Sequence, residues 1–456
     1  MISFTLIPAR TFFLQIALIC FVVAAPWSAR AEKLAWNKEA KTIDADVSTT
    51  TVSNVLTRLA AQTGWEIYLQ PGTTNLASAK FKDLPESKAL TFLLGGMNFS
   101  LVVQSNNITR LSVYHTEAQK ATVRVLPKSL EKGPIPAERV ALLKEGADAQ
   151  KIADKVGALL VGNGTNAARL KFPTEEKALA SETLLENSDG VATIDRNYYV
   201  DPPPQPQQTS ASSSSTFDLQ IKPVNSADQI IIGLIDSKVQ DLPSQMKSFL
   251  LPSIDMAEGG NAGGDTPSHG TLMAETLLKG LAIADESTSS KVRIQPVDVY
   301  GASQTTTTYD VGQGILYAIQ KGANIINLSL GGTDDSAYLR SVIEQASAKG
   351  VLFFAAAGNE PTTAPTYPAA YPSVIAVTAV NRDGSIASYA NRGSFIDIAA
   401  PGSSIGVYQN RNWFVSGTSA SSAYATGFAA GTADAGKSNE QVRSLILQAL
   451  ALKSSK

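Results

Sequence analysis

Three residues in the C-terminal half of the chain could supply a serine nucleophile with its base and acid. Ser419 lies in the small-residue run SGTSA, just before an alanine-rich helical stretch, so little bulk surrounds its hydroxyl. A serine hydroxyl needs a neighbouring imidazole to take its proton, and that imidazole needs a carboxylate to orient it. Asp236 ends an apolar run and His269 opens the run HGT, so an acid, a histidine and a serine follow one another along the chain. Together they predict a hydrolase that works through an acyl-enzyme.

Each of these residues also has an ordinary structural interpretation. Asp236 could cap a helix, His269 could lie on the surface, and Ser419 could be a small packing residue. We favour the catalytic interpretation because His269 is the only histidine in this region and is therefore the one candidate base. Two histidines in the whole chain also exclude a histidine-rich metal site. Asn359, in the run AAAGNE, could donate its amide to a developing oxyanion, or it could simply occupy a turn.

These residues must be positioned by an α/β region that begins near residue 229. Apolar runs that read as strands alternate with helical patterns. The strand-like runs are Ile230–Ile235, Arg293–Val299, Ile325–Leu330, Val351–Ala356 and Val374–Val380, and helical patterns lie at Gly312–Lys321 and Tyr338–Lys349. This alternation predicts a parallel sheet covered by helices on both faces, with a site at the carboxyl ends of its strands. Ser438 and Gln441 predict a capping box that opens a last helix.

Seven stretches of this region resemble the subtilisin-like serine peptidases, the subtilases. In order they are IIGLIDSKV, HGTLMAE, NIINLSLGG, FFAAAGNE, TYPAAYPSVIAVTAV, SYANRGSFIDIAAPGSSI and SGTSASSAYATG, and they span most of residues 229–456. The resemblance implies a subtilisin-like fold with a triad and an oxyanion donor. By this resemblance the triad is Asp236, His269 and Ser419, and the donor is Asn359.

The same resemblance implies where a substrate would bind. One edge would pair with the substrate backbone by strand addition, and its residues are Ser329, Leu330 and Gly331. The pocket for the residue before the scissile bond would be roomy and apolar, because it is lined by Ala356, Ala357 and Gly358. The family pattern also implies that the Tyr367–Pro368 bond is cis.

Four residues near the predicted site depart from the family pattern. Lys238 stands where glycine is usual, which puts a cation near the predicted acid and in a place where the backbone freedom of glycine could be needed. Glu275 replaces a small residue on the helix after the predicted base. Ala420 and Ala423 replace the usual methionine and proline after the nucleophile, and alanine restores a backbone donor that proline lacks. None of the four is itself a catalytic group.

Residues 1–31 read as an export signal. Arg10 precedes an apolar stretch from Phe12 to Ala25, and Ala29–Ala31 supplies an A-x-A cleavage motif. A stretch of about 14 apolar residues is short for a spanning helix, which needs about 20, although an uncleaved anchor is the alternative. Cys20 is the only cysteine, so the mature chain is expected to have no disulfide and no thiol nucleophile. The rest of the chain is expected to be soluble and exported, either periplasmic or secreted.

Residues 32–117 are predicted to form a small α+β domain. An apolar helix face at Val52–Ala60 stops at Gly64, a strand-like Trp65–Leu69 follows, and a second short helix stops at Gly95. Strands are then predicted at Phe99–Val103 and Ile108–Tyr114. The pattern resembles the short N-terminal domain of secretins and TonB-dependent receptors, which implies a module that binds an envelope protein. A folded spacer is the alternative.

Residues 118–200 are predicted to form a second small domain, in the β-α-β-β-α-β order of a ferredoxin-like fold. Its end, VATIDRNYYV, resembles the end of subtilase propeptides, which implies an intramolecular inhibitor that also assists folding. The run Gly162–Ala167 fits the dinucleotide pattern G-x-G-x-x-A, which would need a helix straight after it. The residues that follow alternate like a strand, so we prefer a glycine-rich hairpin.

Residues 201–228 are predicted to be an exposed linker that is easily cut, because proline and serine tracts cannot bury a core. The chain has 456 residues and a formal net charge of −2, without a Lys/Arg cluster, so no nucleic-acid partner is expected. No metal or other cofactor is predicted. There is no clear acidic loop for calcium, although backbone carbonyls could form such a site.

The sequence thus predicts an exported serine endopeptidase made as a zymogen, with a polypeptide substrate and its own propeptide as inhibitor. Its architecture would be a subtilisin-like α/β domain after two small α+β domains. A catalytically inactive envelope binding module with the subtilase fold is the alternative. A lipase-like esterase is disfavoured because no G-x-S-x-G elbow surrounds Ser419.

Overall fold

The structure is a computed structural model. It describes residues 33–37, 39–70, 73, 75–103, 109–118, 123–125, 133–201, 203–209, 221–225, 229–257, 264–285, 288–301, 303 and 305–452. The predicted export signal with Cys20 and the serine tract of the linker lie outside these residues. The chain divides into two compact units, Met1–Lys128 and Ser129–Lys456. Among the described helices, none is long and apolar enough to cross a membrane.

The first unit has its core on helix α1 (Val52–Thr63), whose predicted apolar face is buried. The Thr51 side chain accepts from the Asn54 N–H at the start of α1, and Gly64 ends the helix with a φ of +69°. Two sheets, with strand orders β1-β2-β4 and β5-β6-β3-β7, and the short helix α2 complete this unit. Their bounds are β1 Lys33–Asn37, β2 Thr42–Thr51, β3 Glu66–Leu69, β4 Leu76–Pro85, α2 Glu86–Leu93, β5 Asn98–Val103, β6 Thr109–Tyr114 and β7 Val123–Val125.

Strands β1, β2, β4 and β7 of this unit were not predicted from the sequence. Most side chains of β4 are exposed or half-buried, so its residues show little of the alternation that marks a strand. Strand β7 lies beyond residue 117 and pairs antiparallel with β3, because Val125 buries its side chain in the core of the first unit. The core of the first unit therefore reaches at least to Val125.

The second unit begins with the predicted β-α-β-β-α-β order of elements. The four strands lie side by side in the order β11-β8-β10-β9, and every neighbouring pair is antiparallel. The elements are β8 Pro134–Leu143, α3 Ala149–Val156, β9 Leu159–Gly164, β10 Ala167–Lys171, α4 Glu175–Glu186 and β11 Val191–Val200. Asn166 turns the chain between β9 and β10 with a φ of 51°, so the glycine-rich run is the predicted hairpin and no helix follows it.

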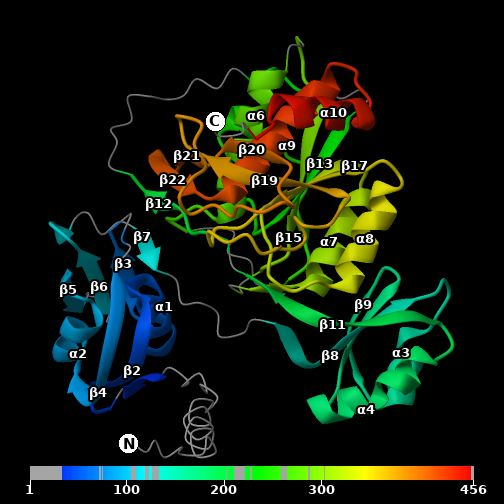
Figure 1. Ribbon diagram of the computed structural model, residues 1–456. Coiled ribbons are helices and arrows are strands. Elements are labelled where there is room, and N and C mark those ends of the chain that lie inside the picture. Colours follow the sequence, from blue (N-terminus) through cyan, green and yellow to red (C-terminus); the bar gives the residue numbers. More distant parts are fainter. Residues whose placement is uncertain are drawn as a thin grey trace, which may run out of the picture. The chain divides into compact units, whose positions relative to one another are not determined.

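A seven-stranded parallel sheet forms the centre of the second unit, in the order β14-β15-β13-β17-β18-β19-β20 (Figure 1). Helices α6, α9 and α10 cover one face, and α7 and α8 cover the other, so the strands are apolar on both sides. The strands are β13 Ile230–Asp236, β14 Ile254–Asp255, β15 Val292–Asp298, β17 Ala323–Leu328, β18 Leu352–Ala356, β19 Val374–Val380 and β20 Ile398–Pro401. The helices are α6 His269–Ala284, α7 Thr308–Gln320, α8 Ala337–Ser347, α9 Thr418–Asp434 and α10 Asn439–Ala449. The predicted parallel sheet and the Ser438 capping box are confirmed.

Three short pairings at the edges of the second unit were not predicted. Strand β16 (Thr306–Thr307) pairs with β11. Strands β21 (Ser403–Tyr408) and β22 (Arg411–Ser416) form a hairpin, and β12 (Gln207–Gln208) of the linker adds to β22. A short helix, α5 (Ser244–Lys247), follows β13, and the Tyr367–Pro368 bond is cis, as expected.

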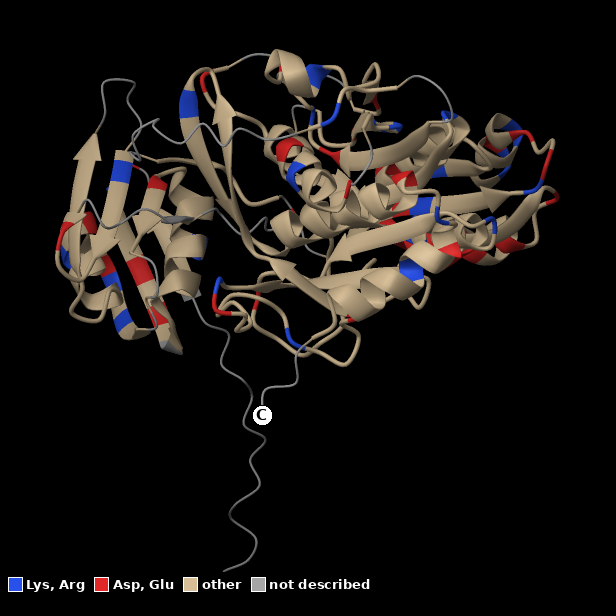
Figure 2. Cartoon of the chain, turned by 90° about the horizontal axis from the view of Figure 1, so that it is seen from above, with Lys and Arg blue, Asp and Glu red and all other residues tan. Residues whose placement is uncertain are grey.

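Charged residues of both signs are interspersed over the chain, and neither sign forms a continuous stripe in the view of Figure 2. Several lie in cross-strand ion pairs, such as Lys80 with Asp46 and Arg169 with Glu138. This mixing agrees with the near-neutral net charge of −2.

Helices α6 and α9 cross with their backbones in contact, because two glycines face the crossing. A Cβ atom added to Gly427 would lie 1.8 Å from the Leu277 carbonyl oxygen, and one added to Gly280 would lie 2.1 Å from the Tyr424 carbonyl oxygen. Distances this short leave no room for a side chain. The glycines therefore set the spacing between the helix that begins at His269 and the helix that carries Ser419.

We expect Gly427→Ala to destabilise the second unit by about 3 kcal/mol or more. The added methyl group would collide with a backbone oxygen, which cannot rotate away, and overpacking of this kind typically costs about 1–3 kcal/mol even where side chains can yield. Thermal unfolding of both proteins measures the effect. The control is Ser444→Ala on the exposed side of α10, which should unfold like the wild type; equal stability of Gly427→Ala would contradict the close crossing.

Candidate active site

The predicted acid and base form a buried pair. Asp236 is the last residue of β13, and His269 is the first residue of α6, whose N-cap is Ser268. The His269 Nδ1 atom lies 2.8 Å from Asp236 Oδ1 and 3.0 Å from Oδ2, and each of the two side chains is 1% exposed. A carboxylate on Nδ1 selects the tautomer whose Nε2 can accept a proton, which is the arrangement that a general base needs.

Gly270, in the run HGT, allows the start of α6, with His269, to lie close to the loop after Asp236. A Cβ atom on Gly270 would lie 2.0 Å from the Ser237 carbonyl oxygen, so only glycine allows the start of α6 to approach the loop after β13. Ser237 also accepts the Gly270 N–H at 3.0 Å and donates its own N–H to Asp236 Oδ1 at 2.7 Å. Backbone and side chain together hold the carboxylate in place.

Ser419 is the second residue of α9 and is 3% exposed. Its hydroxyl donates to the Ser329 carbonyl at 3.0 Å, and the Ser329 hydroxyl donates to the Ser419 carbonyl at 2.9 Å. The structure therefore brings the predicted nucleophile to the end of the predicted substrate edge. Among the described residues, nothing hydrogen-bonds to the buried His269 Nε2 atom, so the serine hydroxyl is directed to Ser329 rather than to its base.

Asn359 lies beside the loop before α9. Its Oδ1 atom accepts from the Thr418 N–H at 2.8 Å and from the Thr418 hydroxyl at 3.1 Å, which leaves the Nδ2 hydrogens available as donors. Gly417 has a φ of +151°, and a Cβ atom on it would lie 3.1 Å from Asn359 Nδ2. This close approach supports the expected role of Asn359 as a donor next to the nucleophile.

The predicted pocket residues lie at the end of β18. Ala356 and Ala357 are buried, and the Ala357 carbonyl accepts from Asn391 Nδ2 at 2.7 Å and from the Thr366 hydroxyl at 2.6 Å. Asn391 is itself buried and also accepts the Glu360 N–H at 3.0 Å. The sequence analysis did not identify Asn391, because its partners lie about 30 residues away and no local pattern marks it.

The side chain of Lys238 forms an ion pair with Asp255. Its ammonium group lies 2.8 Å from Asp255 Oδ2 at the end of β14, and this ion pair lowers the pKa of Asp255. Lys238 is not among the described residues with a positive φ, so the position does not require glycine. Its carbonyl accepts the hydroxyl of Ser268, the N-cap of α6. The lysine thus connects the loop after Asp236 to the start of the helix that carries the base.

Glu275 is a buried carboxyl group between α6 and the β21–β22 hairpin. It is 2% exposed, and its Oε2 atom accepts the Val407 N–H at 3.0 Å. Burial raises the pKa of Glu275 to about 7, against the opposing effects of the Val407 N–H and the Lys279 ammonium. Lys279, one turn further along α6, donates to the Ser404 hydroxyl at 3.0 Å and to the Ile405 carbonyl. The two side chains attach α6 to the hairpin that leads to Ser419.

We expect stability to depend on pH through Glu275. Its pKa rises from 4.5 in the unfolded chain to about 7 in the folded one, so the folded state binds more protons and the free energy of unfolding falls as pH rises from about 4.5 to 7. The expected contribution between pH 5 and pH 8 is about 2–3 kcal/mol. Denaturant unfolding at both pH values should show that Glu275→Gln lacks this part of the fall. The control Glu344→Gln, on the exposed side of α8, should follow the wild type; the same pH curve for all three proteins would contradict the shift.

The end of the ferredoxin-like domain lies along the predicted substrate edge. Tyr199 and Val200 pair antiparallel with β16, and the Asp201 N–H donates to the Gly331 carbonyl at 3.2 Å. Val200 is 3% exposed and packs in the same apolar cluster as the residues of α7 and α8. This domain thus inserts its last strand next to Ser329–Gly331.

Two polar residues of β11 bind the first turns of α8 and α7. Asp195 Oδ2 accepts from the Ser336 hydroxyl at 2.7 Å and from the Tyr338 N–H at 2.9 Å. Asn197 Oδ1 accepts from the Tyr309 N–H at 3.1 Å and is fully buried. Acceptors at helix starts satisfy N–H groups that have no partner within the helix. The negative charge of Asp195 also interacts favourably with the positive end of the helix dipole.

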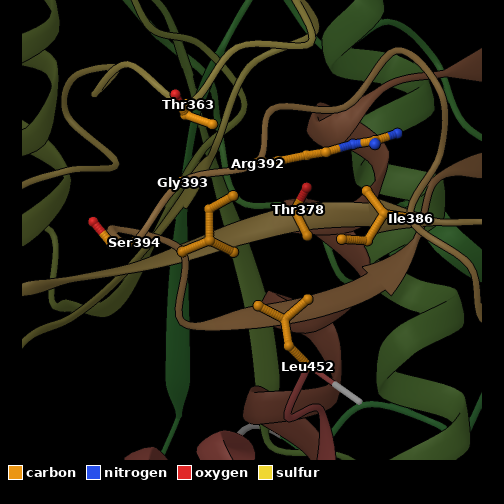
Figure 3. A pocket seen from close by; sticks show the side chains of 8 residues that line it. Thr363, Thr378, Ile386, Arg392, Gly393, Ser394 and Leu452 are labelled. Carbon is orange, nitrogen blue, oxygen red and sulfur yellow. The ribbon is translucent and has the colours of Figure 1, made fainter. Parts of the chain in front are cut away.

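A separate open pocket of about 500 Å³ lies against β19 (Figure 3). Its residues come from β19, the loops on either side of it and the end of the chain, and they are Thr363, Thr378, Ile386, Arg392, Gly393, Ser394, Ile396 and Leu452. The Thr378 hydroxyl donates to the carbonyl of Asn391, whose side chain binds the Ala357 carbonyl. This pocket therefore lies next to the residue that holds Ala357. None of the predicted site residues lines it.

Comparisons with known proteins agree with the fold and the motifs. The model of the subtilase family matches residues 227–455. A thermophilic serine proteinase of Bacillus sp. (strain AK1) is 27% identical over 376 residues, which are 78% of this chain and 89% of that protein. Thermitase of Thermoactinomyces vulgaris is 33% identical over 221 residues, or 47% of this chain and 78% of thermitase.

Two further similarities concern shorter parts of the chain. Subtilisin E of Bacillus subtilis (strain 168) is 36% identical over 181 residues, which are 38% of this chain and 45% of that protein. Among solved structures, that of a mutant of the protease domain of PatA aligns with a TM-score of 0.43 and 24% identity, over 52% of this chain and 91% of that one. The parallel sheet and the family match together define a subtilisin-like serine peptidase domain. The chain belongs to the subtilase family.

Proposed function

We propose that this protein is an exported serine endopeptidase in which Asp236, His269 and Ser419 form the catalytic triad. The observation that supports it most directly is the buried contact between Asp236 and His269 Nδ1, at 2.8 Å. A carboxylate and an imidazole are costly to bury, and this pair is placed at the carboxyl end of a parallel strand, where α/β sites gather.

The reaction uses these groups in sequence. Ser419 Oγ adds to the peptide carbonyl carbon while His269 Nε2 takes its proton, and Asp236 stabilises the resulting imidazolium. The amide of Asn359 and a backbone N–H near Ser419 donate to the oxyanion. His269 then gives the proton to the leaving amine, and water hydrolyses the acyl-enzyme by the same path in reverse. No metal or other cofactor takes part in these steps.

The ferredoxin-like domain, β8 to β11 (Pro134–Val200), is proposed to be the inhibitory propeptide of a zymogen; the predicted start at residue 118 is too early, because β7 belongs to the first unit. This role is supported by Asp195 and Asn197 at the starts of α8 and α7, and by Tyr199–Val200 along β16. The leader-like residues 1–31 support export to the periplasm or beyond. Residues 32–117 are proposed to bind an envelope protein, by their resemblance to the secretin and TonB-receptor domain.

One observation favours the second candidate, an inactive binding module with the subtilase fold. The Ser419 hydroxyl donates to Ser329, and His269 Nε2 has no partner among the described residues. The nucleophile must turn toward its base before it can react.

A fluorophosphonate probe separates the two candidates. We expect the processed protein to be labelled on Ser419, and Ser419→Ala and His269→Ala to remain unlabelled, because the probe needs a serine activated by its base. Asn359→Ala should fold normally and lose about 10²–10³ in kcat for peptide hydrolysis, a magnitude measured on a related subtilisin. Equal labelling of wild type and Ser419→Ala, or no labelling of either, would end the peptidase proposal.

We also expect Ser419-dependent maturation. A cut within residues 201–228 should separate the propeptide from the peptidase domain. Pro203 and Pro206 are buried and Gln207–Gln208 pair with β22, so we expect the cut in the serine-rich part, because serine tracts cannot bury a core and are easily cut. N-terminal sequencing of the wild type and of Ser419→Ala should find a new terminus in this range only in the wild type. Identical unprocessed chains would argue against self-processing.

A further inference from the structure

The chain after the propeptide domain continues past Ser419 and binds on both sides of it. On one side, the Asp201 N–H donates to the Gly331 carbonyl at 3.2 Å, and the Tyr300 hydroxyl donates to the Asp201 carbonyl at 3.1 Å. On the other side, β12 pairs antiparallel with β22, the strand that leads to Ser419 (Figure 1). Between these two contacts, Pro204 Cγ would lie 3.4 Å from a Cβ atom on Gly417.

The pairing on β22 is longer than β12 itself. Gln207 and Gln208 lie opposite Phe414 and Trp413, and the Thr209 N–H donates to the Asn412 carbonyl at 3.0 Å. The exposed edge of β22 therefore binds an extended backbone for at least three residues. This edge follows the scissile position, whereas Ser329–Gly331 precedes it.

The direction of the segment from Asp201 to Pro204, here called the tail, places Pro203 opposite Ser329. Asp201 lies at Gly331, and the tail approaches Ser419 as it runs toward Pro204. The Ser329–Gly331 edge runs in the opposite direction, away from Ser419, because the Ser329 carbonyl at its start is the one bonded to the Ser419 hydroxyl. The two segments are thus antiparallel, so two residues onward in one correspond to two residues back in the other.

A proline at residue 203 changes the hydrogen bonds of the nucleophile. Pro203 is buried and has no N–H to donate to the Ser329 carbonyl, as an ordinary residue in this register would. The Ser419 hydroxyl takes this acceptor at 3.0 Å, and His269 Nε2 is left without a partner among the described residues. The proline therefore favours a serine that points away from its base.

A proline at residue 204 obstructs the cleavage step. Cutting there would require Ser419 Oγ to add to the carbonyl carbon of residue 203 and His269 to pass the proton to the nitrogen of residue 204 as that bond breaks. In Pro204 this nitrogen carries a ring carbon instead of hydrogen. Pro203 is restricted twice, in φ by its own ring and in ψ by the proline that follows, so its carbonyl cannot turn freely toward Asn359.

We propose that residues 199–201 and 203–209 are an inhibitor that occupies both sides of the site and that this enzyme cannot cut, with the β22 edge as the binding site for its second half. This proposal rests on the proposed peptidase function. The β22 edge binds the extended residues that follow the scissile bond. In the uncut chain these residues belong to the linker, and after maturation they belong to the substrate. The maturation cut falls beyond Thr209 and is made by Ser419 of another copy of this chain.

The bond between residues 203 and 204 gives the first test. The full chain is purified as wild type, as the double variant Pro203→Ala/Pro204→Ala, as that variant with Ser419→Ala, and as the control Pro206→Ala. Intact mass and N-terminal sequencing follow the cut at two protein concentrations. We expect the double variant to be cut at 203–204 faster than the wild type by on the order of 100-fold, independently of concentration and only with Ser419 present. Pro206→Ala should behave like the wild type at this bond.

The β22 edge gives the second test, in which the full chain hydrolyses an added chromogenic peptide. Thr209→Pro removes the N–H that binds Asn412, so we expect weaker inhibition and a several-fold higher rate. Gln208→Pro is the matched control, because alternate residues of an antiparallel pair point their N–H groups away from the partner. Equal rates for Thr209→Pro and Gln208→Pro would overturn the role of the edge.

The outcomes also separate this inference from the proposed function. If the processed wild type hydrolyses casein but the full chain is cut at 203–204 as fast as the double variant, the inhibitor is cleavable and the inference fails alone. If the double variant stays intact while processed protein is active, the prolines are not the obstacle and the inference again fails alone. If no processed form hydrolyses casein or reacts with a fluorophosphonate, the peptidase function fails, and this inference fails with it.

Discussion

The geometry of the site depends on the contact between the backbones of α6 and α9. Helices normally keep a side chain's width between them, but Gly280 and Gly427 remove it at this crossing. Both helices lie in the largest apolar cluster of the peptidase domain, which also takes in the strands beneath them. Since His269 is the first residue of α6 and Ser419 the second of α9, the crossing brings the two helix starts to one edge of the sheet. A wider crossing would separate His269 from Ser419, and in catalysis a misplacement of about 1 Å can cost about 100-fold in rate.

The residues that depart from the family pattern are attached to this same arrangement. Lys238 binds Asp255 through its side chain and the N-cap of α6 through its carbonyl. Glu275 and Lys279 bind the β21–β22 hairpin, which continues into the loop before α9. Each therefore connects α6 to a segment next to the triad. The bonds that the structure gives these side chains hold the surroundings of the site.

The ferredoxin-like domain and the subtilisin-like domain form one compact unit, Ser129–Lys456, and they share polar as well as apolar contacts. Asp195 and Asn197 take up helix N–H groups that would otherwise face solvent, and Val200 fills an apolar recess. The linker then continues this interface across the nucleophile to β22. An inhibitor held at three places dissociates slowly even if each contact is weak, because all of them must open together.

Much of the fold follows from local sequence signals. The continuous Ile/Val/Leu runs predicted the parallel sheet, because strands buried on both faces have no polar alternation. The HGT and SGTSA runs predicted two helix starts with close backbone approach, because only small residues allow it. The family motifs then assigned Asp236, His269, Asn359 and Ser419 to one site. The structure joins Asp236 to His269, and it bonds Ser419 to Ser329, which follows β17, the strand next to β13.

The features that the sequence did not predict depend on contacts between residues far apart in the chain. Asn391 binds the Ala357 carbonyl from a loop about 30 residues away. Strand β7 belongs to the first unit, although it lies beyond the last residue predicted for that domain. Strand β12 is a strand because it pairs with β22. The sequence also could not show that Ser419 would bond to Ser329 rather than to His269. Composition and periodicity report which face of an element is apolar. Where an unpaired carbonyl or N–H finds its partner depends on what the rest of the chain brings beside it, and that is decided only when the chain is folded.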